Sequence, residues 1–328
     1  MELSTVRDES LSQALEKVYE MLSDTISAPA GNGRIAKVLE HAASRGKLLR
    51  PRLLLISAMF GESYGKNLHL LINAASALEI SHMASLIHDD IIDDSPLRRG
   101  KATVQGKYGK DVAVYTGDLL LARAARLLSA EDFRCLAESY SDALEQLCIG
   151  EIMQDISRYD PNISKAQYLE NIRGKTAVLF KLACGTGARL SGCSDEQIEE
   201  LEHFGEILGM LFQIRDDMLD ISADSKQMGK ETMVDFAEGI YTLPVFMALE
   251  NPDVAPRLRE IIALNAQGAI ERSVIDEAFE LINSSGATEK CRREINAYAE
   301  KLLAIVCKLP ECPASTMLSE MVEALANV

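Results

Sequence analysis

The sequence contains the pattern Asp-Asp-x-x-Asp twice, each time inside a segment with helical periodicity. The first copy spans Asp89 to Asp93, and the second spans Asp216 to Asp220. Because residues i and i+4 lie one turn apart on the same face of a helix, each copy places two carboxylates side by side. Two like charges repel each other there unless a cation lies between them. Mg²⁺ prefers carboxylate oxygens and shares its remaining positions with water and phosphates. The two copies therefore predict two magnesium-binding carboxylate pairs.

Basic residues accompany the acidic patterns. Arg98 and Arg99 follow Pro96, which ends the first acidic helix. Lys47 and Arg50 lie three residues apart at an expected helix start, which suits an anion. The guanidinium group offers a fork of donors that matches phosphate oxygens. Surface solubility is the usual role of such residues, but beside two carboxylate pairs they predict phosphate binding.

The segments that carry these residues have the periodicity of helices. Apolar residues recur at spacings of three and four along nearly the whole chain, and prolines separate the segments. Ser164 with Gln167 has the spacing of a capping box. We expect helices over 9–26, 35–44, 50–61, 67–94, 111–129, 132–158, 164–190, 194–222, 232–250, 255–264, 273–284, 288–308 and 314–327. The expected fold class is all-α, in a single domain over residues 1–328.

Composition excludes several classes of partner. The chain of 328 residues carries a net charge of −16, which argues against nucleic acid and against anionic membrane surfaces. No apolar run approaches the length of a transmembrane segment, and the first residues lack the pattern of a secretory signal. Seven cysteines without a CxxC pair indicate reduced thiols. We expect a cytoplasmic protein without a transmembrane segment.

The ordered series of motifs extends well beyond the acidic pairs. In chain order the motifs are Gly46-Lys47 with Arg50-Pro51, Asp89-Asp90-Ile91-Ile92-Asp93 with Arg98-Arg99-Gly100, Gly117-Asp118, Gly174-Lys175-Thr176-Ala177, Phe212-Gln213, Asp216-Asp217-Met218-Leu219-Asp220, Gly229-Lys230 and Thr242-Leu243-Pro244. Together they resemble the motifs of the trans-type (head-to-tail) isoprenyl diphosphate synthases, over residues 45 to about 250. The resemblance implies a bundle of long helices around a deep central cavity, and a homodimer.

The resemblance also implies a role for each motif. The ligands of three Mg²⁺ ions that clamp an allylic diphosphate would be Asp89, Asp93, Asp216 and Asp220. The cations on that same diphosphate would be Arg98, Lys175 and Lys230. The diphosphate of isopentenyl diphosphate would be bound by Lys47, Arg50, His82 and Arg99. The acceptor groups that stabilise the allylic cation would be Thr176, Gln213 and backbone carbonyls near Lys175. The two acidic helices are then expected to face each other across a pocket.

Product length is a further expectation from the first acidic helix. Ala84 and Ser85 stand where short-chain members of the family have a bulky aromatic residue, and Ser81, Ala77 and Ala74 continue the same small-residue face. An open cavity floor and a product longer than geranylgeranyl follow, as in long-chain polyprenyl synthases. The competing interpretation is that these small residues serve tight helix packing.

Several alternatives stay open at this point. His82 on an apolar helix could be an ordinary core histidine. Ile240 stands where the family often has a lysine, which puts one diphosphate contact in doubt. A short-chain farnesyl or geranylgeranyl synthase, or a subunit of a heteromeric synthase, also fits the motifs. A class I terpene cyclase is disfavoured, because such enzymes lack paired cations for a second diphosphate.

Overall fold

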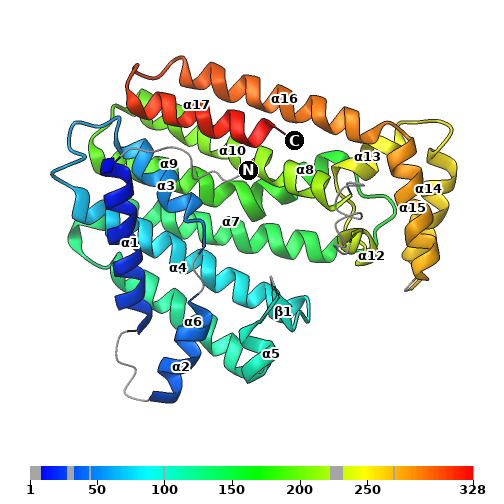
Figure 1. Cartoon of the computed structure of the whole chain (residues 1–328), viewed down its shortest axis with the longest axis horizontal. Coiled ribbons are helices and arrows are strands. Elements are labelled where there is room, and N and C mark those ends of the chain that lie inside the picture. The colour runs from blue at the N-terminus through cyan, green and yellow to red at the C-terminus, as the bar shows by residue number, and fades with distance from the viewer. Residues whose placement is uncertain are drawn as a thin grey trace. The chain divides into compact units, whose positions relative to one another are not determined.

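The computed structural model describes residues 9–27, 33–43, 46–98, 100–221, 232–268 and 270–327, which are almost entirely helical (Figure 1). The all-α class is therefore confirmed. The chain forms two compact units, an N-terminal unit of Glu2–Tyr140 with Leu182–Glu202 and a C-terminal unit of Ser141–Lys181 with His203–Val328. The single domain expected over 1–328 stays a prediction.

The N-terminal unit is built around one long helix, α4. Its elements in chain order are α1 (Glu9–Ser27), α2 (Gly33–Ala42), α3 (Leu49–Ala58), α4 (Leu68–Ile92), β1 (Leu97–Arg98), β2 (Lys101–Ala102), α5 (Val104–Tyr108), α6 (Lys110–Leu127) and the 3₁₀ turn η1 (Glu131–Leu136). Helix α4 packs against α1, α3 and α6 (Figure 1). The first acidic pattern lies at its C-terminal end.

Helix α4 is the core helix of this unit. By length and composition it could cross a membrane, but 72% of its most apolar window is buried inside the protein. At its contact with α6, a Cβ atom at Gly117 would lie 2.2 Å from Nε2 of His88, so the His88 ring packs directly over this glycine. Burial against neighbouring helices explains why α4 is apolar around most of its circumference.

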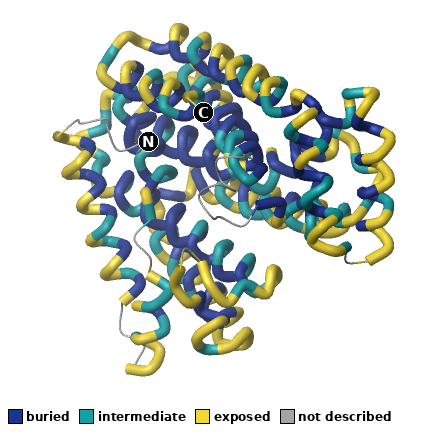
Figure 2. Tube along the Cα trace, turned by 45° about the vertical axis from the view of Figure 1, so that its right-hand side comes forward, coloured by how far each residue is buried: buried dark blue, intermediate teal, exposed yellow. Residues whose placement is uncertain are grey.

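The C-terminal unit holds the second acidic pattern. Its helices, some of which extend into the other unit, are α7 (Ala137–Ile156), α8 (Lys165–Ile172), the π-helical turn η2 (Arg173–Ala177), α9 (Val178–Ser191), α10 (Asp195–Asp220), α12 (Val234–Ala237), α13 (Leu243–Leu249), α14 (Ala255–Asn265), α15 (Arg272–Ser284), α16 (Ala287–Val306) and α17 (Pro313–Ala326). Helix α16 packs against α13, α15 and α17. Figure 2 shows buried residues along the inner sides of these helices and exposed residues on their outer sides.

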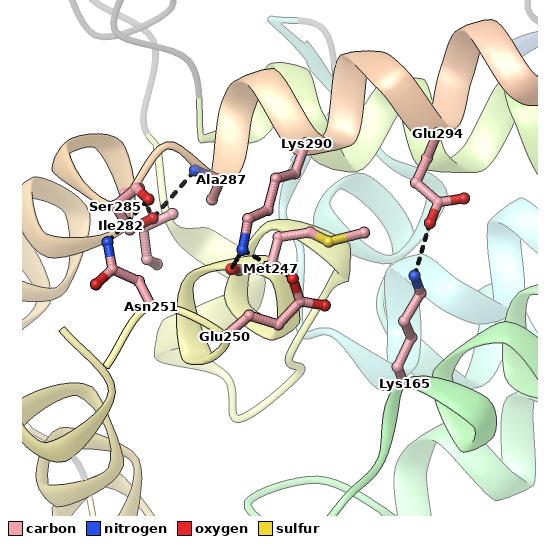
Figure 3. A network of polar contacts seen from close by, with 9 residues as sticks. All are labelled: Lys165, Met247, Glu250, Asn251, Ile282, Ser285, Ala287, Lys290 and Glu294. Carbon is pink, nitrogen blue, oxygen red and sulfur yellow. Dashed lines mark hydrogen bonds and ion pairs between the residues drawn. The ribbon is translucent and has the colours of Figure 1, made fainter. Parts of the chain in front are cut away.

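Polar contacts tie α16 to the end of α13 and to the start of α8 (Figure 3). Lys290 donates to Glu250 at 2.8 Å and to the carbonyl of Met247 at 3.2 Å, which ties α16 to the end of α13. Lys165 at the start of α8 donates to Glu294 at 2.8 Å. The first turn of α8 is thus anchored to α16.

The structure differs from the expected elements at several places, and the helix expected over 132–158 begins as the 3₁₀ turn η1. The hairpin of β1 and β2 and the short helix α5 were not expected, and Gly100 in the hairpin turn has a φ of +74°. The helix expected over 164–190 contains the π turn η2. The helix expected over 232–250 is broken, because Gly239 at φ +76° follows α12 and Pro244 begins α13 afresh.

Candidate active site

The first acidic pattern separates into two accessible carboxylates and one buried carboxylate. Asp89 is half-buried and Asp93 is exposed at the C-terminal end of α4, while Asp90 is only 7% exposed. The backbone N–H of Asp93 still donates to the carbonyl of Asp89 at 2.9 Å, so the helical spacing extends to Asp93. The pair predicted to bind metal is therefore the pair that solvent can reach.

Asp90 anchors the loop that follows α4. Its carboxylate accepts from Nε of Arg98 at 2.9 Å, and its carbonyl accepts from Nε2 of Gln105 at 2.8 Å. Burial raises the pKa of Asp90, while Arg98 opposes this rise. Arg98, predicted to contact the allylic diphosphate, thus also fixes the loop to the helix, and 42% of its side chain remains exposed.

The predicted isopentenyl-binding cations stand at the start of α3. Lys47 is exposed just before the helix, and Arg50 lies in its first turn. Burial lowers the pKa of Arg50 to about 10, and the nearby Glu79 opposes this shift, so the guanidinium stays charged at neutral pH. Glu79 of α4 is 6% exposed, and a Cβ atom at Gly46 would lie 3.2 Å from its Oε1. Glu79 therefore faces the cation-bearing segment, a feature that the sequence analysis missed.

Two of the three histidines of α4, His82 and His88, have different surroundings. His82 is half-buried, and its carbonyl accepts from the hydroxyl of Ser85 at 2.9 Å. It lies two helical turns before Asp89, so both share one face of α4. Nε2 of His88 lies 3.5 Å from Oδ1 of Asp118 and 3.4 Å from the carbonyl oxygen of Val114, which accounts for it without a role in chemistry.

The small-residue face of α4 is buried, and one aromatic side chain meets it. Ala84 is fully buried and Ser81 is 2% exposed. The Ser81 hydroxyl donates to the carbonyl of Ala77 at 2.9 Å and forms a hydrogen bond with the Tyr140 hydroxyl. Farther along α4, Ala74 and Tyr140 are among the residues lining an apolar cavity of about 10 Å³. Tyr140, which the sequence analysis did not identify, covers the face that was predicted to set product length.

The second acidic pattern repeats the arrangement of the first. At the end of α10, Asp216 is exposed and Asp220 is half-buried, whereas Asp217 is 4% exposed. Asp217 accepts from Nε2 of Gln213 at 2.7 Å and from the hydroxyl of Tyr168 at 2.6 Å. Burial raises the pKa of Asp217 to about 7, against the effect of these two donors. In both patterns the second aspartate has a structural role, which spacing alone did not reveal.

The chemistry of Asp220 fits a divalent cation. Its pKa is raised to about 6, because burial and the negative charge of Asp235 both penalise the ionised form. A bound cation would remove this repulsion. Within the described ranges, no three carboxylate, imidazole or thiolate groups already gather as a metal cluster. Paired carboxylates suit Mg²⁺, which takes its other ligands from water and phosphate.

Lys175 lies in the π turn η2, which packs tightly against α7. Its ammonium group pairs with Glu151 of α7 at 3.0 Å. A Cβ atom at Gly150 would lie 2.5 Å from the backbone nitrogen of Lys175, and one at Gly174 would lie 3.1 Å from Cα of Gly150. Two glycines thus let the backbones touch. Single π turns inside α-helices occur frequently at functional sites.

The structure brings the two predicted cation-stabilising side chains together. Thr176 of η2 is 6% exposed, and its hydroxyl donates to Oε1 of Gln213 at 2.7 Å. Gln213 in turn donates to Asp217, as described above. The predicted residues Arg99 and Lys230 lie outside the described residues. Glu79, Tyr140 and Tyr168 are the site neighbours that the sequence analysis missed, because their partners are distant in the chain.

Comparisons with known proteins agree on one family. The family model "Polyprenyl synthetase" matches residues 32–282. The octaprenyl diphosphate synthase of Escherichia coli (strain K12) is 33% identical over 268 residues, covering 82% of this chain and 81% of that protein. The heptaprenyl diphosphate synthase component 2 of Bacillus subtilis (strain 168) is 33% identical over 314 residues, covering 96% and 84%.

A solved structure is similar over nearly the full length. The polyprenyl synthase from Caulobacter crescentus CB15, complexed with calcium and isoprenyl diphosphate, has a TM-score of 0.85 and 30% sequence identity, covering 97% of this chain and 95% of that one. The family match, the sequence relatives and this structure all point the same way as the motif series. The chain belongs to the polyprenyl synthetase family, the trans-type polyprenyl diphosphate synthases.

Proposed function

We propose that this prenyltransferase condenses isopentenyl diphosphate with an allylic diphosphate, head to tail, to give a long-chain all-trans polyprenyl diphosphate. The observation that carries the proposal is the repeated arrangement of the acidic patterns. In each pattern two accessible aspartates stand on a helix end that a buried, hydrogen-bonded aspartate holds in place. Such paired carboxylates, together with the cations at Lys47 and Arg50, suit two diphosphate substrates.

The chain's own residues divide the work of the reaction. Asp89 and Asp93, with Asp216 and Asp220, hold the Mg²⁺ ions of the allylic diphosphate, for which we propose a count of three. When bound, these ions neutralise the negative charge that develops on the departing diphosphate. Lys47, Arg50 and His82, with Arg99, bind the diphosphate of isopentenyl diphosphate. Arg98, Lys175 and Lys230 add positive charge to the allylic diphosphate.

Thr176 and Gln213 serve the carbon that becomes cationic. Oxygen acceptors fixed beside that carbon stabilise positive charge without having to reorganise during the step. Exclusion of water keeps the cation from being hydrolysed. The double bond of isopentenyl diphosphate then attacks the cation. A proton is lost to the released diphosphate, which completes the balance of charge.

The purified chain provides the direct test. With Mg²⁺, isopentenyl diphosphate and primers of several lengths, we expect consumption of isopentenyl diphosphate and products longer than geranylgeranyl by mass spectrometry. Chelation by EDTA should stop the reaction, and added Mg²⁺ should restore it. A product formed from the allylic substrate alone would instead indicate a cyclase.

A heteromeric synthase is the second candidate. One sequence relative is named as component 2 of a heptaprenyl diphosphate synthase, and it covers 96% of this chain. In that case the purified chain alone would be inactive and would gain activity with a second, different subunit. Robust turnover by the chain alone excludes a required partner. The seven free cysteines suit a reducing environment, and we propose a cytoplasmic enzyme.

We also propose a homodimer, on the basis of an apolar stripe along α7. Ile149, Ile152, Met153 and Ile156 are 43%, 56%, 44% and 72% exposed, at positions i, i+3, i+4 and i+7 of one helix face. A pocket of about 290 Å³ beside the stripe is lined in part by Ile149 and Met153, and also by Arg173, Lys181, Glu170 and Glu206. Apolar residues flanked by charges of both signs suit a self-complementary contact with a second copy.

The dimer proposal predicts a change of mass in solution. Replacing Ile152 and Ile156 together by glutamate should give a monomer by light scattering, because two charges would be buried in the contact. The matched control is Leu264→Glu, since Leu264 is 45% exposed on α14 of the same unit. A monomeric wild-type chain, or a double variant that remains dimeric, would contradict the proposal.

A further inference from the structure

A chain of three hydrogen bonds crosses the interior of the C-terminal unit. The hydroxyl of Tyr168 on α8 donates to Oδ2 of Asp217 at 2.6 Å, and Nε2 of Gln213 donates to Oδ1 of the same carboxylate at 2.7 Å. At the other end, the hydroxyl of Thr176 donates to Oε1 of Gln213 at 2.7 Å. Tyr168 and Asp217 are each only 4% exposed. The bonds connect α8, α10 and η2.

This series of hydrogen bonds decides which end of the Gln213 amide faces Thr176. The Tyr168 hydroxyl occupies one carboxylate oxygen of Asp217, and the other oxygen accepts from the NH₂ end of the Gln213 amide. The carbonyl oxygen must then lie on the side of Thr176. With the opposite orientation, the amide would present N–H groups to the site. Their partial positive charge would destabilise a carbocation nearby.

Tyr168 is held firmly enough to act as the fixed end of this series of hydrogen bonds. Ser164 and Gln167 form a capping box at the start of α8. Lys165 in the same turn is anchored to Glu294 at 2.8 Å (Figure 3). The centroid of the Tyr168 ring lies 5.8 Å from that of the Phe246 ring, and the two rings are tilted relative to each other. Packing alone would be served equally well by phenylalanine, whereas the buried hydroxyl requires a partner.

We propose that Tyr168 is a positioning residue for ionisation of the allylic diphosphate, acting through Asp217 to hold the Gln213 carbonyl oxygen toward the developing cation. The inference rests on the proposed prenyl-transfer function, in which Gln213 and Thr176 stabilise that cation. Tyr168 itself contacts no reacting atom in this scheme. Its hydroxyl fixes the carboxylate, the carboxylate fixes the amide, and the amide oxygen serves the substrate.

The test compares a charged analogue with an uncharged one. In the ammonium analogue of the allylic diphosphate, a positively charged nitrogen replaces the carbon that becomes cationic. In the S-thiolodiphosphate analogue, that carbon stays neutral and does not react. We expect Tyr168→Phe to weaken binding of the ammonium analogue about tenfold and to leave binding of the thiolodiphosphate within about twofold. The value of kcat should fall about tenfold, with the KM of both substrates little changed.

Matched variants separate positioning from a general loss of structure. Tyr298→Phe removes a hydroxyl from another half-buried tyrosine of the same unit. It should change neither the relative binding of the two analogues nor kcat. In a Gln213→Ala background, Tyr168→Phe should have little further effect, because its influence passes through the amide. If Tyr168→Phe does not fold, Asp217→Asn replaces one acceptor by a donor, and it should cause the same selective loss of the ammonium analogue.

The outcomes distinguish this inference from the function on which it rests. Wild-type chain that consumes no isopentenyl diphosphate, alone or with a partner, would overturn the proposed function and this inference together. An active wild-type enzyme in which Tyr168→Phe weakens both analogues equally, or neither, would overturn the inference alone. Full additivity of Tyr168→Phe with Gln213→Ala would also overturn it.

Discussion

Asp89→Ala and Asp216→Ala should each lower the turnover of isopentenyl diphosphate by several orders of magnitude while the helical fold is retained. A thousandfold loss corresponds to about 4 kcal/mol of transition-state stabilisation, a size expected when a metal ligand beside a departing diphosphate is removed. Asp89 is half-buried and Asp216 is exposed, so neither replacement removes a fully buried side chain. Each change also relieves repulsion from the carboxylate one turn away.

The structure sharpens this prediction by separating the aspartates within each pattern. Asp217→Ala would leave the buried donors of Tyr168 and Gln213 without their acceptor, at a cost of about 1–3 kcal/mol each. We therefore expect Asp217→Ala to lower the melting temperature, whereas Asp216→Ala leaves it unchanged or slightly raised. Turnover measurements and thermal melts on the same preparations check both halves of the prediction.

Controls for the aspartate variants come from the same helices. Asp94→Asn removes a negative charge just beyond the first pattern, and asparagine tolerates the φ of +48° found there. Glu199→Gln removes an exposed charge from α10. Both should keep turnover within about twofold of wild type, as expected for surface changes. Near-normal turnover in Asp89→Ala or Asp216→Ala would remove the assignment of these residues to metal.

Ala84→Phe should shorten the product to geranylgeranyl or less. Ala84 is fully buried and lies five residues before Asp89, about 7–8 Å along the axis of α4. A phenyl ring there would occupy space that we propose for the growing chain. Overpacking costs about 1–3 kcal/mol, so a melt must accompany the product analysis. Thin-layer chromatography and mass spectrometry of the products measure the change.

A second variant should act in the opposite direction. The Tyr140 hydroxyl bonds to Ser81, and the Tyr140 ring borders the small cavity beyond it. Tyr140→Ala should therefore lengthen the product. His69→Phe places a phenyl ring at an exposed position of the same helix and should leave the product unchanged. An unchanged product in Ala84→Phe would favour the competing interpretation, in which the small residues only allow close packing of helices.

Periodicity predicted the long helices well, but short-range features escaped it. The helix starts at Asp195 and Lys165 follow capping serines, which the sequence displays directly. The break between α12 and α13 did not show as a change of period, because buried apolar residues lie on both sides of it, Phe236 in α12 and Leu243 to Ala248 in α13. The π turn at Lys175 likewise reflects the close contact of Gly150 with Gly174, a tertiary feature.

Residue type and spacing also identified most of the candidate site. A pair of metal-binding carboxylates, or a pair of phosphate-binding cations, depends on a few side chains at fixed intervals on one element. Such intervals are visible in the sequence. The neighbours that hold those side chains were not visible. Arg98 reaches back to Asp90 across a turn, and Tyr168 reaches Asp217 from a helix 49 residues earlier.

The sequence by itself determined the all-α class, the family, the two aspartate pairs and the cations that accompany them. Only the tertiary structure decided which aspartate of each pattern is accessible and which is buried, and that Gln213 bonds to Thr176. The reason is physical. Local spacing fixes which side chains share a helix face, whereas burial and hydrogen-bond partners depend on elements that fold together from distant parts of the chain.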